Sequence, residues 1–179
     1  MTLVQKIVAV HRALAAAELP HAFGGALALA WCTKRARGTI DIDVNVFVDT
    51  EQCDVVLAAL STDVDHNARQ RTALARDGQV RLRWDETPVD IFLNTTPFHT
   101  AVMQRFRWER LGDNDLPFLA CQDIAVFKAF FNRTKDWADL EEMQDAGTLD
   151  VGRVLGVLTE YLELDDERVR RLDGLRGRG

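Results

Sequence analysis

The most constraining feature of the chain is a short segment in which apolar and acidic residues alternate. From Asp41 to Val48 the sequence reads D-I-D-V-N-V-F-V, and every second side chain of an extended strand points to the same face. One face carries Ile42, Val44, Val46 and Val48, and the other carries Asp41, Asp43 and Asn45. Two carboxylates on one face repel each other, so the pattern predicts a buried strand whose acidic face holds a cation. A divalent metal ion is the expected cation.

Two further segments belong with this strand. The pair Gly24-Gly25 follows a short apolar strand expected over 21–23 and precedes a small helix expected over 26–31. Glycine lets backbone N–H groups approach a phosphate closely. A later strand, expected over 89–93, carries Asp90 on the face opposite Val89, Ile91 and Leu93. If the two strands pair, their three aspartates face one cleft, and such a set suits two Mg²⁺ or Mn²⁺ ions that hold a nucleoside triphosphate.

The rest of the chain predicts helices and strands in a mixed order. Helices are expected over 3–19, 51–60, 97–105, 122–132, 136–146, 151–162 and 167–175, and further strands over 79–84, 107–111 and 116–119. The segment 63–71 has no pattern that decides between a helix and a strand, and Asp77-Gly78 and Thr87-Pro88 predict turns. This order indicates an α+β (α/β-like) fold, a mixed sheet flanked by helices. The expected division is a core over 1–120 and a helical C-terminal region over 121–179 that packs on it.

Composition restricts the class of protein further. With 179 residues, 47% hydrophobic and 28% charged, the chain is expected to fold rather than stay disordered. It shows no apolar run of about 20 residues and no signal-peptide layout, which predicts a cytoplasmic protein without a membrane contact. The three cysteines are far apart and form no C-x-x-C motif, so reduced, buried thiols are expected. A net charge of -6 argues against a general nucleic-acid binder.

A local RNA groove is still compatible with this charge, because arginines are frequent in the middle of the chain. Arginine makes planar, bidentate contacts to phosphate. The candidate groove residues are Arg69, Arg71, Arg76, Arg81, Arg83, Arg105, Arg107 and Arg110. A charged face on an ordinary domain is the alternative explanation.

The ordered set of Gly24-Gly25, Asp41-x-Asp43 and Asp90 resembles the signature of the nucleotidyltransferase superfamily typified by DNA polymerase beta. The resemblance implies a polymerase-beta-type core and an enzyme that transfers a nucleoside monophosphate from an NTP and releases pyrophosphate. It also implies that the three aspartates bind Mg²⁺ or Mn²⁺ and are catalytic. Asp90 would assist deprotonation of the acceptor hydroxyl, and the glycines would bind the nucleotide.

A second motif narrows the resemblance. Lys128 followed by R-T-K-D-W-A-D over 133–139, together with T-I-D-I-D over 39–43, resembles the AbiEii/MenT-type toxin nucleotidyltransferases. This resemblance implies transfer to the 3′ acceptor end of tRNA, with CTP as a candidate donor, which blocks translation, and a cognate antitoxin protein as partner. The implied roles are nucleotide binding for Lys128, Arg133 and Thr39, catalytic support from Lys128 and Asp136, and regulatory phosphorylation for Thr39.

Other interpretations stay open. Enzymes of this fold also adenylylate antibiotics of the aminoglycoside type or modify proteins, although the arginines favour an RNA acceptor. A catalytically inactive nucleotide-binding or interaction module is a further alternative, and the intact aspartates count against it. At single positions, Asp136 also fits an acidic residue in the first turn of a helix, and Lys128 also fits the solvated surface of an amphipathic helix.

Overall fold

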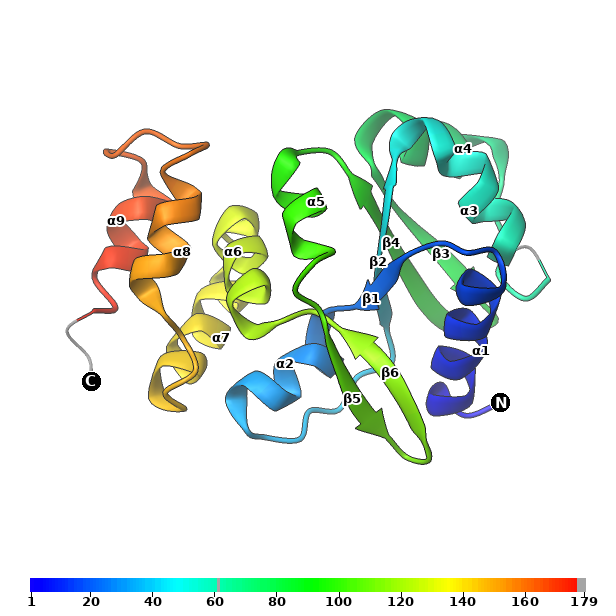
Figure 1. Cartoon of the computed structure of the whole chain (residues 1–179), viewed down its shortest axis with the longest axis horizontal. Helices are drawn as coiled ribbons and strands as arrows, with labels where there is room; N and C mark the ends of the chain where they lie inside the picture. Colours follow the sequence, from blue (N-terminus) through cyan, green and yellow to red (C-terminus); the bar gives the residue numbers. More distant parts are fainter. Residues whose placement is uncertain (61, 177–179) are drawn as a thin grey trace. The chain divides into compact units, whose positions relative to one another are not determined.

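A mixed sheet forms the core of the first of two units in the chain (Figure 1). The computed structural model describes residues 1–60 and 62–176. The first unit comprises Met1–Gly25 with Gly38–Leu119, and the second comprises Ala26–Arg37 with the residues from Ala120 onward. The predicted packing of the C-terminal helices on the core stays a prediction.

Six strands of the described residues make up the sheet, in the order β3-β4-β2-β1-β6-β5. Their bounds are β1 His21–Phe23, β2 Ile42–Asp49, β3 Gln79–Trp84, β4 Thr87–Asn94, β5 Arg107–Leu111 and β6 Asn114–Phe118. The pairs β2–β4 and β1–β6 are parallel, whereas β1–β2, β3–β4 and β5–β6 are antiparallel. The predicted mixed sheet with flanking helices is therefore confirmed.

Both units contain helices. The first unit holds α1 Leu3–Ala16, the 3₁₀ turn η1 Thr50–Gln52, α3 Cys53–Leu60, α4 Ala68–Asp77 and α5 Pro97–Val102. The second holds most of α2 Gly25–Thr33, with α6 Cys121–Phe131, α7 Thr134–Asp145, α8 Val151–Leu158 and α9 Glu167–Asp173. No helix in residues 1–60 and 62–176 combines the length and the apolar character needed to cross a bilayer.

Strand β2 lies inside the sheet, with β4 on one side and β1 on the other. Ile42, Val44 and Val46 are completely buried, as β-branched residues on the core face of a strand should be. The opposite face is partly covered too, because Asn45 and Phe47 are only 5% exposed. An exposed edge strand is thus excluded for this segment.

One local prediction was wrong, and one segment that predicted no clear element is partly helical. The segment 63–71 contains the start of α4, which begins with a capping box between Asn67 and Gln70. Gly78 ends this helix in the left-handed conformation, with φ 66°, so the turn predicted at Asp77-Gly78 leads from α4 into β3. The turn predicted at Thr87-Pro88 is wrong, because both residues are part of β4. The chain reverses two residues earlier, between Trp84 and Thr87.

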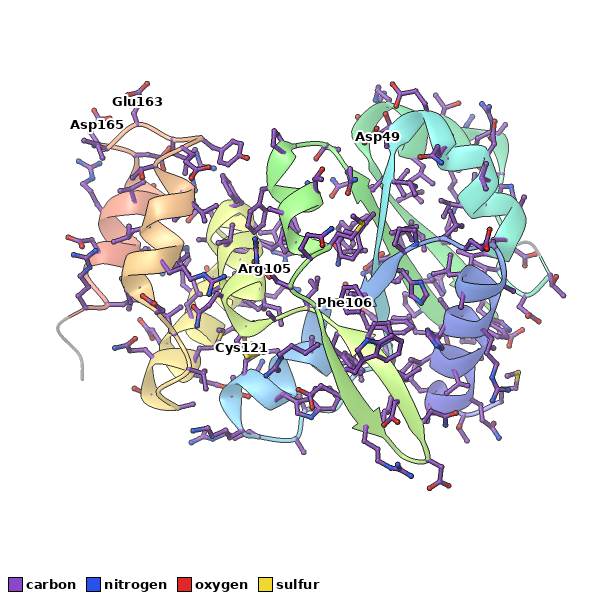
Figure 2. The ribbon with its side chains drawn as sticks, viewed as in Figure 1. Asp49, Arg105, Phe106, Cys121, Glu163 and Asp165 are labelled. Atoms are coloured by element: carbon purple, nitrogen blue, oxygen red, sulfur yellow. A yellow bond between two sulfur atoms is a disulfide. The ribbon has the colours of Figure 1, made fainter. Side chains whose placement is uncertain are left out.

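The expectation of three reduced cysteines was also wrong. Cys32 and Cys121 form a disulfide within the second unit, with Cα atoms 5.4 Å apart, and only Cys53 is a free, buried thiol. Cys121 is labelled in Figure 2. Widely spaced cysteines give no sequence signal for such a pair. Because disulfides are rare in the cytosol, this one weighs against the cytoplasmic location, which stays a prediction.

A histidine pair connects α1 to β1, with His21 buried and His11 partly exposed. The Nδ1 atom of His21 lies 2.7 Å from the carbonyl oxygen of Leu19, and its Nε2 atom lies 2.9 Å from Nδ1 of His11. Since a carbonyl can only accept, His21 carries its proton on Nδ1 and accepts from His11 through Nε2. Burial lowers the pKa of His21 to about 4, although the Leu19 hydrogen bond raises it and His11 lowers it slightly.

This pair predicts a loss of stability in mild acid. In the unfolded chain His21 has its usual pKa of 6.5, so the unfolded state takes up a proton first as the pH falls. The contribution is fully present above pH 6.5 and is lost between pH 6.5 and 4. Between pH 7.5 and 5 the resulting loss in the free energy of unfolding amounts to about 2 kcal/mol. In the variant His21→Asn the amide can replace the Nδ1 donor, but it does not titrate. We expect its free energy of unfolding in urea to fall by about 2 kcal/mol less than that of the native protein between the two pH values. Equal losses would contradict the prediction.

Candidate active site

The acidic residues predicted on two strands lie side by side in the sheet. In the parallel β2–β4 pair Asp43 is the register partner of Asp90, and in the antiparallel β3–β4 pair Asp90 is the partner of Arg81. The three residues therefore form one row across β2, β4 and β3. Like charges in directly opposed positions destabilise a sheet unless a cation neutralises them.

Arg81 supplies that cation in this structure. Its Nε and NH2 atoms donate to the two carboxylate oxygens of Asp90, at 2.8 and 2.6 Å. The same NH2 lies 3.4 Å from Oδ2 of Asp41. Hydrogen bonding to Asp90 and its charge, with smaller contributions from Asp41 and Asp43, raise the pKa of Arg81 above its usual value.

Asp41 is placed by the turn that precedes β2. Thr39 Oγ1 accepts a hydrogen bond from the backbone N–H of Asp41 at 3.1 Å. This is the local side-chain-to-backbone bond that serine and threonine make in turns. Thr39 thus orders the backbone that presents the first aspartate, and its predicted nucleotide contact and phosphorylation stay predictions.

The glycine pair lies directly against the second aspartate. Gly24 donates its backbone N–H to the carbonyl oxygen of Asp43 at 2.9 Å. Gly25 has φ 56°, and a Cβ atom there would lie 1.9 Å from Oδ2 of Asp43. Both the left-handed backbone and the contact with the carboxylate therefore require glycine at this position. Gly25 is also the first residue of α2.

The donor set suits a hard divalent ion, although the ligands are not assembled for one. Carboxylate oxygens are the ligands that Mg²⁺ prefers, and a single guanidinium already serves as the shared counterion of Asp41 and Asp90. Within residues 1–60 and 62–176, no group of three or more His, Cys, Asp or Glu residues is arranged to hold a metal ion. The chemistry of the residues fits Mg²⁺ or Mn²⁺. In this structure the carboxylates of Asp41 and Asp90 are paired with Arg81.

The other predicted site residues lie in the second unit and form an ion network. Lys128 Nζ lies 2.5 Å from Oδ2 of Asp139 and 3.4 Å from Oδ1 of Asp136. Arg37 binds the other carboxylate oxygen of Asp139, at 2.5 Å, and also pairs with Glu142. Asp139 and Arg37 were not predicted as members of this group, although the predicted motif contains Asp139.

Asp136 is the most buried member of this network, with no exposed surface. Arg133 donates through Nε and NH2 to its two carboxylate oxygens, at 2.6 and 3.2 Å. Burial raises the pKa of Asp136, but hydrogen bonds from Arg133 and the charges of Lys128 and Arg133 outweigh it, so that the pKa is lowered. The network explains how these charges are tolerated, and the nucleotide-binding and catalytic roles of its members stay predictions.

Most of the arginines proposed for an RNA groove are paired with acids. Arg71 makes a bidentate contact with Asp54, with both distances 2.5 Å, and Arg81 makes one with Asp90. Further ion pairs are Arg76–Asp77, Arg107–Glu109 and Arg110–Asp113. Such pairs reduce the positive potential that an RNA backbone would meet.

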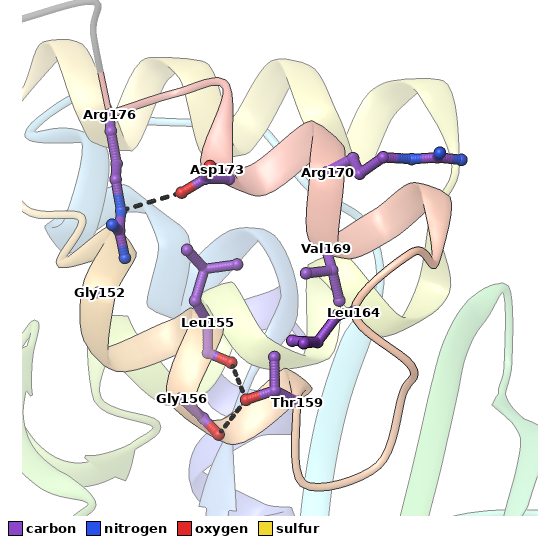
Figure 3. A pocket seen from close by; sticks show the side chains of 9 residues that line it. All are labelled: Gly152, Leu155, Gly156, Thr159, Leu164, Val169, Arg170, Asp173 and Arg176. Atoms are coloured by element: carbon purple, nitrogen blue, oxygen red, sulfur yellow. Dashed lines mark hydrogen bonds and ion pairs between the residues drawn. The ribbon is translucent and has the colours of Figure 1, made fainter.

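A hollow of about 480 Å³ lies in the second unit, lined by α8, α9 and the loop that joins them (Figure 3). Its wall combines Leu155, Leu164 and Val169 with Asp173 and Arg176, which form an ion pair at 3.2 Å. None of the predicted site residues lines it. It adds no chemistry to the acidic row.

Known proteins resemble this chain in fold. No family model matches the sequence, and no curated protein matches it. Solved structures match its three-dimensional form. The antibiotic-resistance factor ANT(2″)-Ia in solution superposes with a TM-score of 0.58 at 16% identity, over 98% of this chain and 91% of that one. Its crystal structure with adenylyl-2″-tobramycin gives 0.60 at 13% identity, over 90% and 100%.

A second antibiotic-modifying enzyme has a similar fold. The lincomycin-bound lincosamide adenylyltransferase LnuA matches with a TM-score of 0.52 at 12% identity, over 79% of this chain and 96% of that one. A nucleotidyltransferase-like protein from Paracoccidioides brasiliensis matches with a TM-score of 0.51, also at 12% identity, over 96% and 85%. The chain therefore has the nucleotidyltransferase fold, and the row of aspartates lies on the sheet of that fold.

Proposed function

We propose that the protein is a metal-dependent nucleotidyltransferase that transfers a nucleoside monophosphate from an NTP to a hydroxyl acceptor. The observation that carries the proposal is the row in which Asp43 and Asp90 are neighbours across β2 and β4, with Asp41 sharing the counterion of Asp90. Two carboxylates in register on neighbouring strands destabilise a sheet, so their presence in its interior favours a functional role over an ordinary solvated surface. The nucleotidyltransferase fold of the chain supports the same reaction.

The reaction needs positioning and charge neutralisation more than covalent chemistry. The acceptor oxygen forms a bond to the α-phosphorus, the bond between the α- and β-phosphates breaks, and pyrophosphate leaves. Asp90 would accept the proton of the acceptor hydroxyl, and the Gly24-Gly25 backbone would lie close to the phosphates. A bound Mg²⁺ or Mn²⁺ would neutralise the triphosphate and the charge that develops on it. Asp41 and Asp43 would hold that ion, and Asp90 would complete its set of ligands.

The 3′ acceptor end of tRNA is the first acceptor we propose. Its support is the pair of sequence motifs, over 39–43 and from Lys128 to Asp139, that resemble toxin nucleotidyltransferases. The same resemblance suggests CTP as a donor, inhibition of translation as the outcome, and a cognate antitoxin as the partner. Each of these points is part of the proposal.

A small hydroxylated antibiotic is a second candidate acceptor, favoured by two observations. The candidate RNA-binding arginines are largely paired with acids, as in Arg71–Asp54 and Arg81–Asp90. The solved structures that match include one with adenylyl-2″-tobramycin and one with bound lincomycin. The matched regions of ANT(2″)-Ia span nearly all of both chains.

Incubation with labelled nucleoside triphosphates tests the reaction and the acceptor together. Purified protein is mixed with Mg²⁺, each NTP in turn, and total tRNA or a panel of aminoglycosides and lincosamides. The native protein should label one acceptor class. Asp41→Ala should lower the rate at least about 100-fold, because the variant lacks a metal ligand where charge develops. Asp49→Ala, which removes an exposed carboxylate from the far end of β2, is the matched control and should keep the rate.

The outcomes separate the candidates. Label on tRNA supports the toxin interpretation, and label on a drug supports the second candidate. If no acceptor is labelled, and Mg²⁺ with NTP does not raise the melting temperature of the native protein, nucleotide binding itself is refuted. Equal rates for Asp41→Ala and Asp49→Ala would refute the assignment of the site.

A further inference from the structure

Arg81 supplies positive charge to the acidic row, as a bound metal ion would. Both carboxylate oxygens of Asp90 are engaged by its guanidinium, at 2.8 and 2.6 Å, and Asp41 lies 3.4 Å from the same group. The side chain of Asp90 is only 15% exposed, so water compensates it little. Asp90 therefore depends on a cation, and in this structure that cation belongs to the chain.

We propose that Arg81 is a built-in counterion that holds Asp90 and Asp41 and competes with the metal ion for them. The inference rests on the proposed metal-dependent reaction and adds a positioning residue to it. In the absence of metal, Arg81 prevents repulsion between the neighbouring aspartates. When the ion binds, the guanidinium leaves Asp90 and turns toward solvent.

Two properties of arginine make the competition unavoidable and reversible. The guanidinium stays protonated at every accessible pH, so the site cannot relieve repulsion between Arg81 and a divalent ion by releasing a proton. Relief must come from movement of the side chain. Arg81 is 58% exposed and reaches the row from β3, so its head can move into water without leaving a buried, unpaired charge.

Arg83 offers a matched control on the same strand. It lies two residues from Arg81 and so on the same face of β3, and it is also exposed. In the sheet it is opposite Pro88, two residues along the strands from the acidic row. Substituting either arginine by glutamine removes one positive charge from this face, and only Arg81→Gln removes the partner of Asp90.

Titration with Mn²⁺ in the absence of nucleotide, followed by electron paramagnetic resonance, tests the inference without measuring activity. Arg81→Gln should bind Mn²⁺ about fivefold more tightly than the native protein, the size expected for removal of a partly exposed ion pair. Arg81→Lys keeps the charge but loses the bidentate contact, so its affinity should fall between the two. Arg83→Gln should bind like the native protein. In the Asp90→Asn background, Arg81→Gln should change the affinity by less.

Each result decides between explanations. If the native protein binds Mn²⁺ and Arg81→Gln binds it no more tightly, the inference is overturned while the metal-dependent reaction stands. Equal gains in Arg81→Gln and Arg83→Gln would also overturn it, because they would show a general effect of charge. If no variant and no native sample binds Mn²⁺, the metal-dependent reaction fails and the inference fails with it.

Discussion

Gly25→Ala is expected to lower nucleotidyl transfer at least about 100-fold, the size typical of a misplaced reacting group. The new Cβ would lie 1.9 Å from Oδ2 of Asp43, 2.5 Å from its Cγ and 2.9 Å from its Cβ. No rotation of a methyl group removes such contacts, so the carboxylate or the glycine turn must move. Asp43 is the register partner of Asp90, and its displacement would break the acidic row.

The effect of the clash can be separated from the effect of backbone strain. Gly25 has φ 56°, and an alanine in this left-handed region costs about 1 kcal/mol even without a clash. Gly112 has φ 62°, and a Cβ added there would meet nothing within 4 Å, so Gly112→Ala carries the strain alone. Gly38→Ala, with open space around it, serves as a baseline.

The three glycine variants are compared in rate, melting temperature and circular dichroism, well below the lowest melting temperature. Gly38→Ala and Gly112→Ala should keep the rate of the native protein, and Gly112→Ala should lose a little stability. Gly25→Ala should lose both rate and stability. If Gly25→Ala transferred nucleotide as fast as Gly112→Ala, the contact with Asp43 would have no role in the reaction.

The sequence contained strong signals for the strands that carry the site. Alternation of β-branched and acidic residues over 41–48 defines the faces of β2, because a strand repeats every two residues. The same period places Asp90 on the acidic face of β4. The β2–β4 pairing could only be assumed, because parallel neighbours far apart in the chain leave no local pattern.

The ion pair between Arg81 and Asp90 depends on where the hairpin of β3 and β4 turns. Pro88 predicts a turn, yet it lies within β4 opposite Arg83. The connection is therefore the two-residue turn Asp85-Glu86, and such a short turn fixes the register of a hairpin. In that register Arg81 must be opposite Asp90. Recognition of the short turn would have predicted the ion pair.

Helix α4 and the second unit show two other limits. Only Leu74 of α4 is buried, so this helix lacks the apolar stripe that reveals most helices. The capping box of Asn67 and Gln70 was the available signal. The segment Ala26–Arg37 belongs with residues from Ala120 onward, which is a long-range contact that composition cannot show.

The disulfide provides the second large prediction, on stability. Cys32 and Cys121 are separated by 89 residues, and closing a loop of this length restricts the unfolded chain strongly. The chain-entropy model gives about 4 to 5 kcal/mol for such a loop. Reduction should therefore lower the free energy of unfolding in urea by several kcal/mol, and the Cys32→Ala/Cys121→Ala variant should be similarly destabilised.

Thiol counting and a reductant control make this prediction decisive. Under denaturing conditions the oxidised native protein should react as one thiol, Cys53, and the reduced protein as three. Adding reductant should not destabilise the double alanine variant further, because that variant has no disulfide to lose. Three reactive thiols in protein purified under air, or equal stability with and without reductant, would show that the pair does not cross-link the chain. A stable cystine would in turn favour a protein that matures in an oxidising compartment, which a toxin acting on cytosolic tRNA would not require.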